Sequence, residues 1–93
     1  MLKQNEFILS KQLIRSGTSI GANLEEALAG QSRKDFISKM AISSKEARET
    51  NYWLRLLRDS RLCDGIDYTN LISESEEIIK ILTSIVKTSQ AGN

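Results

Sequence analysis

The sequence contains no histidine and no proline, and it has one cysteine among its 93 residues. Without histidine, the chain cannot activate a serine or cysteine nucleophile with an imidazole, and it lacks the usual zinc and di-iron ligands of helical proteins. The lone Cys63 cannot form an intramolecular disulfide, which suits a reducing cytoplasm. No stretch approaches the roughly 18 apolar residues of a membrane span, and the polar first six residues do not resemble a secretory signal. We therefore expect a cytoplasmic protein with no cofactor, no bound metal and no membrane partner.

Carboxylate pairs are the remaining candidates for catalysis. Glu25 and Glu26 are neighbours in the sequence, and adjacent side chains on a helix point apart. Glu74 and Glu77 lie one helical turn apart, but the solvated surface of a helix is the ordinary place for glutamates. We therefore predict that the protein is not an enzyme.

Few helix breakers and many Leu, Ile, Ala, Glu, Lys and Arg residues favour long helices. Apolar residues recur at helical spacing in three segments. We expect these helices at about residues 5–29, 33–63 and 67–89 of a single domain that covers residues 1–93. Short connections make sequential helices antiparallel neighbours. The predicted fold class is therefore all-α, with an antiparallel up-down helix bundle.

Residues that cap or interrupt helices mark the ends of these segments. Ser32 and Asp67 are suitable N-caps for the second and third helices, and Gly30 is a plausible C-terminal cap for the first. Gly17 and Gly21 lie four residues apart inside the first helix. We expect these two glycines to permit close helix packing rather than to bind phosphate.

The middle segment is apolar on more than one side. One stripe at helical spacing consists of Phe36, Met40, Ala47 and Leu54. The residues that project from other sides are Tyr52, Trp53, Leu56 and Leu57. A helix that is apolar on several sides has to be buried on several sides. Either the two aromatic residues are half-exposed at the end of the bundle, or Tyr52, Trp53, Leu56 and Leu57 form a subunit interface, where aromatic residues are enriched. We predict the second arrangement, a homo-oligomer.

A polar seam runs along the first helix. Its members share one face and are Gln12, Arg15, Ser19, Asn23 and Glu26. Small polar residues are unusual on a wet helix surface, so a seam packed against other helices competes with a solvated face. In a packed seam, Arg15 would need a carboxylate partner. By residue type, the candidates are Glu26 and Glu49, and we count Glu49 in the seam.

Basic residues are concentrated in the middle of the chain. Residues 32–63 carry eight Lys or Arg against four Asp or Glu, whereas residues 64–93 carry two against five. The net charge of the chain is only +1, so this distribution permits a nucleic-acid partner without requiring one. The candidate phosphate contacts are Lys34, Lys45, Arg48, Arg55 and Arg58.

Three stretches together resemble a known family. They are QLIRSGTSIGANLEEA at residues 12–27, Ser32-x-x-Asp35-Phe36, and Lys45-Glu46-Ala47-x-Glu49-Thr50-x-x-Trp53-Leu54. The pattern is similar to the four-helix-bundle family of 23S rRNA intervening-sequence proteins, over about residues 7–86. That family looks related to the accessory variability determinants of diversity-generating retroelements.

The resemblance implies an antiparallel bundle that assembles into a barrel-shaped homopentamer. It also implies possible partners, because the retroelement relatives bind a reverse transcriptase and nucleic acid through basic surfaces. The sequence departs from the family in two ways. Family members usually carry another helix before the segment that matches residues 7–28, so the three helices here correspond to helices 2–4 of the bundle. Either the chain is a shortened version or its true start lies upstream, and a missing first helix would leave an apolar groove that another chain can fill. Its net charge is also much less basic than that of the nucleic-acid-binding relatives.

Two functions from different classes follow from these observations. The first is a non-enzymatic, homo-oligomeric scaffold or interaction module that resembles the 23S rRNA intervening-sequence proteins. The alternative is an RNA- or DNA-binding accessory protein that uses the basic surface of the middle helix.

Overall fold

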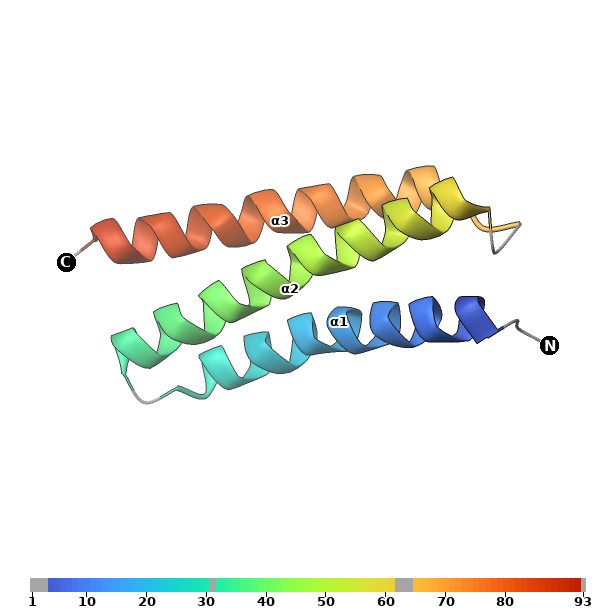
Figure 1. The fold of residues 1–93 in the computed structure, drawn as a ribbon. Coiled ribbons are helices and arrows are strands. Elements are labelled where there is room, and N and C mark those ends of the chain that lie inside the picture. The colour runs from blue at the N-terminus through green and yellow to red at the C-terminus, as the bar shows by residue number, and fades with distance from the viewer. Residues whose placement is uncertain (1–3, 31, 62–64, 93) are drawn as a thin grey trace.

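The computed structural model describes residues 4–30, 32–61 and 65–92, with the backbone alone for residues 4–6. These residues form three α-helices and no strand: α1 (Gln4–Leu28), α2 (Arg33–Ser60) and α3 (Tyr68–Ala91). The helices run up, down and up, with α2 in the middle (Figure 1). The predicted all-α fold class is confirmed. Cys63 lies outside the described residues.

The three helices form a single layer rather than a closed bundle. Helix α2 packs against both neighbours, but within the described residues no Cα atom of α1 lies within 8 Å of one in α3. The Cα atoms accordingly occupy a slab of 49 × 20 × 13 Å. The backbone of each outer helix therefore lies close to α2 only, while side chains of all three helices meet in the core.

The helix ends follow the local sequence, with two exceptions. The side chains of Ser32 and Asp67 accept hydrogen bonds from the third residue beyond, at 3.0 Å and 3.1 Å, which confirms both as N-caps. Helix α2 ends at Ser60, earlier than expected, because Arg61 adopts a left-handed conformation with φ of 57°. Gly30 has no positive φ. A Cβ atom there would lie 2.5 Å from a carboxylate oxygen at the end of the flexible Asp35 side chain and 3.1 Å from the backbone oxygen of Ala27, so a larger residue would require both to shift.

The core consists of two apolar clusters placed along α2. Towards the N-terminal end of α2, the first contains Ala27, Met40, Ala47 and Leu82. Towards its C-terminal end, the second contains Leu54, Leu57, Tyr68 and Ile72, with Leu9 and Leu13 packed against it. Each cluster draws on all three helices, so α2 provides the common wall of both.

Small polar residues lie at the helix contacts between and beside these clusters, and we call them the polar belt. Its members are Ser16, Ser43, Thr50, Asn51 and Ser75. Thr50 donates a 2.9 Å hydrogen bond to Ser16, which joins α2 to α1, and Asn51 donates a 2.8 Å hydrogen bond to Ser75, which joins α2 to α3. Ser43 donates to the backbone oxygen of Ile20 at 2.9 Å. Because these bonds form in one register only, the belt fixes how the outer helices sit on α2.

An apolar groove of about 210 Å³ runs between α1 and α3 on one broad face of the slab. Ala47, Thr50 and Leu54 of α2 form its floor, Gly17 and Ile20 line it from α1, and the residues from α3 are Leu71, Glu74, Ser75 and Ile78. The groove lies between two helices whose Cα atoms do not come within 8 Å of each other in the described residues.

Gly17 and Gly21 do not serve the close packing that we expected within this chain. A Cβ atom on either residue would have nothing within 4 Å, apart from its own helix backbone and chain neighbours. The prediction fails because Gly21 is exposed and Gly17, although half-buried, lines the open groove between α1 and α3.

The open surroundings of the two glycines give a testable expectation. Glycine inside a helix is less stable than alanine by about 0.5–1 kcal/mol. The double variant Gly17→Ala/Gly21→Ala should therefore raise the free energy of unfolding by about 1–2 kcal/mol, measured by urea denaturation. A loss of stability in this variant would show instead that another helix approaches this side of α1 closely.

Candidate functional site

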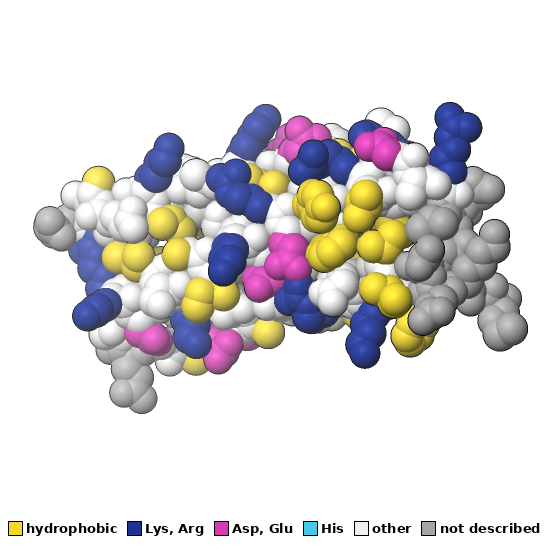
Figure 2. Space-filling model, viewed as in Figure 1, with side chains coloured by type: hydrophobic (Ala, Val, Ile, Leu, Met, Phe, Trp, Pro, Cys, Tyr) yellow, Lys and Arg dark blue, Asp and Glu magenta, His cyan; other side chains and the backbone are white. Residues whose placement is uncertain are grey.

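One side of α2, which we call its outer side because it is opposite the apolar groove, carries a compact group of side chains. We call this group the aromatic patch, and it consists of Tyr52, Trp53 and Leu56. The two aromatic rings pack edge to face, with centroids 5.1 Å apart and planes at 64°. The Tyr52 side chain is 49% exposed, while Trp53 and Leu56 are half-buried. Figure 2 shows hydrophobic side chains gathered over the C-terminal half of α2 on this face, beside acidic and basic groups. The patch lies on the opposite side of α2 from the apolar groove, because Tyr52 and Leu54 project about 200° apart around the helix.

Leu57, the fourth residue predicted for the interface, belongs to the core instead. It is only 2% exposed and lies in the cluster with Leu54, Tyr68 and Ile72. The prediction is wrong for this residue because α3 begins at Tyr68, whose ring lies in the same cluster as Leu57. Leu56, one residue earlier, points about 100° away around the helix and stays near the surface.

Polar partners hold the aromatic patch in place. The Trp53 indole N–H donates a 3.1 Å hydrogen bond to Glu49, and Glu49 forms an ion pair with Arg15 of α1. Arg15 also donates to Gln12 at 2.9 Å and lies 3.5 Å from Glu46. The predicted carboxylate partner of Arg15 is therefore Glu49 rather than Glu26. This chain of contacts fixes the orientation of Trp53 from two helices.

The rest of the polar seam does not join this network. Asn23 donates to the Ser19 side chain at 3.1 Å within α1, and Glu26 lies 3.5 Å from Lys39 of α2. The seam therefore divides into three separate groups along the edge between α1 and α2. Arg15 is exposed, so the seam is packed against one helix and not enclosed by several.

The burial of the fully enclosed polar residues was not predicted from the sequence. Ser16 and Ser43 are completely buried, and neither was assigned to the seam. A signal for Ser16 was present, because it falls at helical spacing on the apolar stripe between Leu13 and Ile20. A small polar residue on an apolar stripe indicates a close helix contact.

The five predicted basic contacts are all exposed but lie in different surroundings. Lys34 and Lys45 project from the outer side of α2. Arg58 pairs with Asp59 at 2.8 Å, and this hydrogen bond, together with the charge of Arg58, lowers the pKa of the Asp59 carboxyl. Arg48 and Arg55 lie along the furrow between α2 and α3. The structure thus brings together only two of the five.

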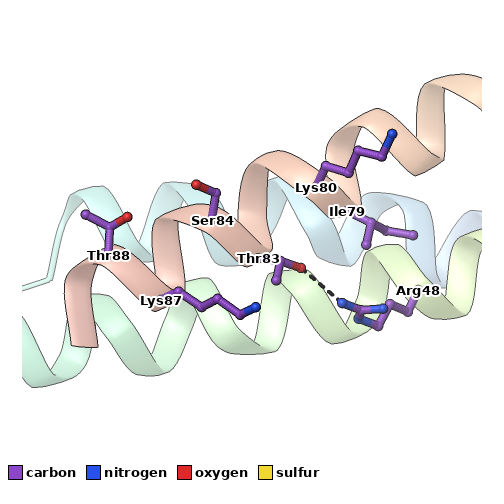
Figure 3. A pocket seen from close by; sticks show the side chains of 7 residues that line it. All are labelled: Arg48, Ile79, Lys80, Thr83, Ser84, Lys87 and Thr88. Atoms are coloured by element: carbon purple, nitrogen blue, oxygen red, sulfur yellow. Dashed lines mark hydrogen bonds between the residues drawn. The ribbon is translucent and has the colours of Figure 1, made fainter. Parts of the chain in front are cut away.

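Two lysines of α3, Lys80 and Lys87, complete the basic side of this furrow and were not predicted. Together with Arg48 they line a hollow of about 440 Å³ (Figure 3). Residues 64–93, which contain both lysines, carry a net negative charge, so the charge count of this segment does not indicate a basic site. Their spacing of seven residues, which places both on one side of α3, is the signal that identifies them.

The described part of the chain offers no other obvious site. It contains no group of three or more Cys, Asp or Glu side chains arranged to hold a metal ion. None of its helices is long and apolar enough to cross a membrane.

Comparisons with known proteins place the chain in a family. The model of the 23S rRNA-intervening sequence protein family matches residues 1–84. No curated protein matches the sequence significantly. A crystal structure of a protein of unknown function from the S23 ribosomal protein family of Bacteroides thetaiotaomicron is 52% identical, with a TM-score of 0.84. The match covers 92% of this chain and 80% of that one. The sequence match and the shared helical architecture agree, and the chain belongs to the 23S rRNA-intervening sequence protein family.

Proposed function

We propose that the protein is a cytoplasmic, non-enzymatic scaffold that assembles with copies of itself and presents the assembly to other macromolecules. The observation that carries this proposal is the aromatic patch on the outer side of α2. The described chain leaves this patch in contact with solvent, although edge-to-face aromatic pairs of this kind are typical anchors of protein interfaces. By resemblance to its family, we propose a pentamer.

The aromatic patch has the features of an energetic centre for association. Trp53 is held by Glu49, and Glu49 by Arg15, so its ring loses little freedom on binding. The Arg55 guanidinium lies 5.9 Å from the centre of the Tyr52 ring and supports it from the side. Leu56 adds aliphatic surface one turn from both aromatic residues. A rigid aromatic centre with charged groups at its edge is the usual anatomy of an interface.

Mass measurement of three variants tests the proposal. Trp53→Glu and Tyr52→Glu each place a charge in the patch, and burying an unpaired charge in an interface costs several kcal/mol. Both variants should shift the oligomer to a smaller species in light scattering at micromolar concentration. The matched control is Leu28→Glu at the end of α1, because Leu28 is 78% exposed and lies away from both the patch and the groove.

Circular dichroism on the same samples separates dissociation from unfolding. We expect all three variants to stay helical and only the patch variants to change mass. A monomeric wild-type protein would overturn the proposal. An oligomer that dissociates with Leu28→Glu but not with Tyr52→Glu or Trp53→Glu would also overturn it, because the patch would then lie outside the interface.

A further inference from the structure

A furrow between α2 and α3 gathers positive charge that the overall composition conceals. Arg48 lines it from α2, and Lys80 and Lys87 line it from α3. In Figure 3, Lys87 extends towards the hydrogen bond between Arg48 and Thr83, while the Lys80 side chain points away from Arg48, at the other end of the hollow. The side chains of Ser84 and Thr88 add hydroxyl groups to the same hollow.

The three cations are available for a ligand. Arg48 donates a 3.0 Å hydrogen bond to the Thr83 hydroxyl, which holds its guanidinium at the furrow and leaves other N–H groups unused. Within the described residues, none of Arg48, Lys80 and Lys87 forms an ion pair, and no carboxylate lines this hollow. Three positive charges around one hollow create a positive potential that attracts anions.

The charges follow a line rather than converge on one point. Arg48 and Arg55 are seven residues apart on α2, as are Lys80 and Lys87 on α3, and each interval spans about 10 Å. Arg55 and Lys80 line the adjoining hollow of about 390 Å³, where Glu76 is the acidic residue. A single small anion would meet one end of this line only. An extended chain of phosphates matches the whole of it.

We propose that the furrow between α2 and α3 binds the phosphodiester backbone of a nucleic acid strand. Arg48 and Lys87, with the Thr83 hydroxyl, contact one phosphate, and Lys80 with Arg55 contacts another further along. Glu76 repels the backbone and marks the end of the bound segment. Contacts of this kind go to phosphates, so the binding does not depend on base sequence. The proposal does not rest on self-association, because every residue of the furrow comes from one chain.

Fluorescence anisotropy with a labelled 20-nucleotide oligouridylate tests this assignment. Wild-type protein should bind more weakly as salt rises from about 50 to 150 mM, because binding releases counterions. Each lost phosphate contact should reduce the slope of log affinity against log salt by about 0.7. We expect Arg48→Gln and Lys87→Gln to weaken binding at least about fivefold each at low salt, and their combination to reduce the slope by about 1.4.

Lys11→Gln is the matched control, because it removes the same charge from an exposed position on α1, away from the furrow. It should change affinity less than about twofold. A second variant, Glu76→Gln, should tighten binding by removing a repulsive charge. These opposite signs distinguish the furrow from a general effect of net charge.

Three results would overturn the proposal. The first is no binding by the wild-type protein at low salt. The second is an equal loss of affinity in Lys11→Gln and Lys87→Gln. The third is displacement of the oligonucleotide by polyglutamate, or by millimolar inorganic phosphate, beyond the effect of chloride at the same ionic strength. A monomeric protein that binds the oligonucleotide would refute the scaffold proposal and leave this one standing.

Discussion

Replacing Leu57 with alanine should lower the free energy of unfolding by about 2–5 kcal/mol, the usual cost of truncating a buried leucine. Leu57 is almost completely buried in the cluster with Leu54, Tyr68 and Ile72. A chain of this size has a total stability of only about 5–15 kcal/mol. The loss should therefore lower the melting temperature by roughly 8 °C or more.

The neighbouring residue provides the control for this experiment. Leu56→Ala removes the same atoms from the aromatic patch, so we expect it to cost less than about 1 kcal/mol within the single chain and to weaken association instead. Urea denaturation followed by circular dichroism, at one fixed protein concentration, compares the two, because association also contributes to apparent stability. Equal losses in Leu56→Ala and Leu57→Ala would contradict the assignment of one leucine to the core and the other to the surface.

Replacing Ser43 with leucine should separate α1 from α2. The Ser43 side chain is 0% exposed, and its hydroxyl lies 2.9 Å from the backbone oxygen of Ile20. A leucine side chain has no space there, and overpacking of this kind typically costs about 1–3 kcal/mol. Because no α3 backbone lies close to α1, α1 depends mainly on its contacts with α2. We expect it to become the least protected helix.

Limited trypsin digestion detects this change, since α1 contains cleavage sites at Lys11 and Arg15. Cleavage at these sites should accelerate in Ser43→Leu while α2 and α3 remain protected. Ser44→Leu is the control, because Ser44 lines an open hollow of about 260 Å³ facing α3, where a larger side chain has room. Faster cleavage of α1 in both variants, or in neither, would show that the polar belt does not hold this helix.

Features determined by neighbouring residues in the sequence were predictable. Ser32 and Asp67 were identified as N-caps because a capping side chain bonds to a backbone N–H only three residues away. The three helices followed from apolar periodicity and the scarcity of breakers. The end of α2 did not follow from these signals, because the residue with positive φ that ends the helix is Arg61 and not a glycine.

Features that depend on how the helices are arranged around α2 were harder to predict from the sequence. Helical spacing from Leu54 places Leu57 on the apolar stripe, but its burial against Tyr68 and Ile72 depends on how α3 packs on α2. Glu49 was one of two predicted partners of Arg15, but the sequence did not decide between Glu49 and Glu26, and the second carboxylate near Arg15 is Glu46, which was not considered. Lys80 and Lys87 stayed unnoticed because their effect depends on facing Arg48 of another helix.

The two broad faces of the slab constrain the symmetry that an assembly can have. If the aromatic patch met the same patch on a second copy, the contact would be isologous and would close at two subunits. A ring with an odd number of subunits requires a heterologous contact, in which each copy uses two different surfaces. This chain carries two such surfaces, the aromatic patch and the apolar groove on the opposite side of α2. In a five-membered ring, the patch of each subunit must therefore meet a surface other than itself.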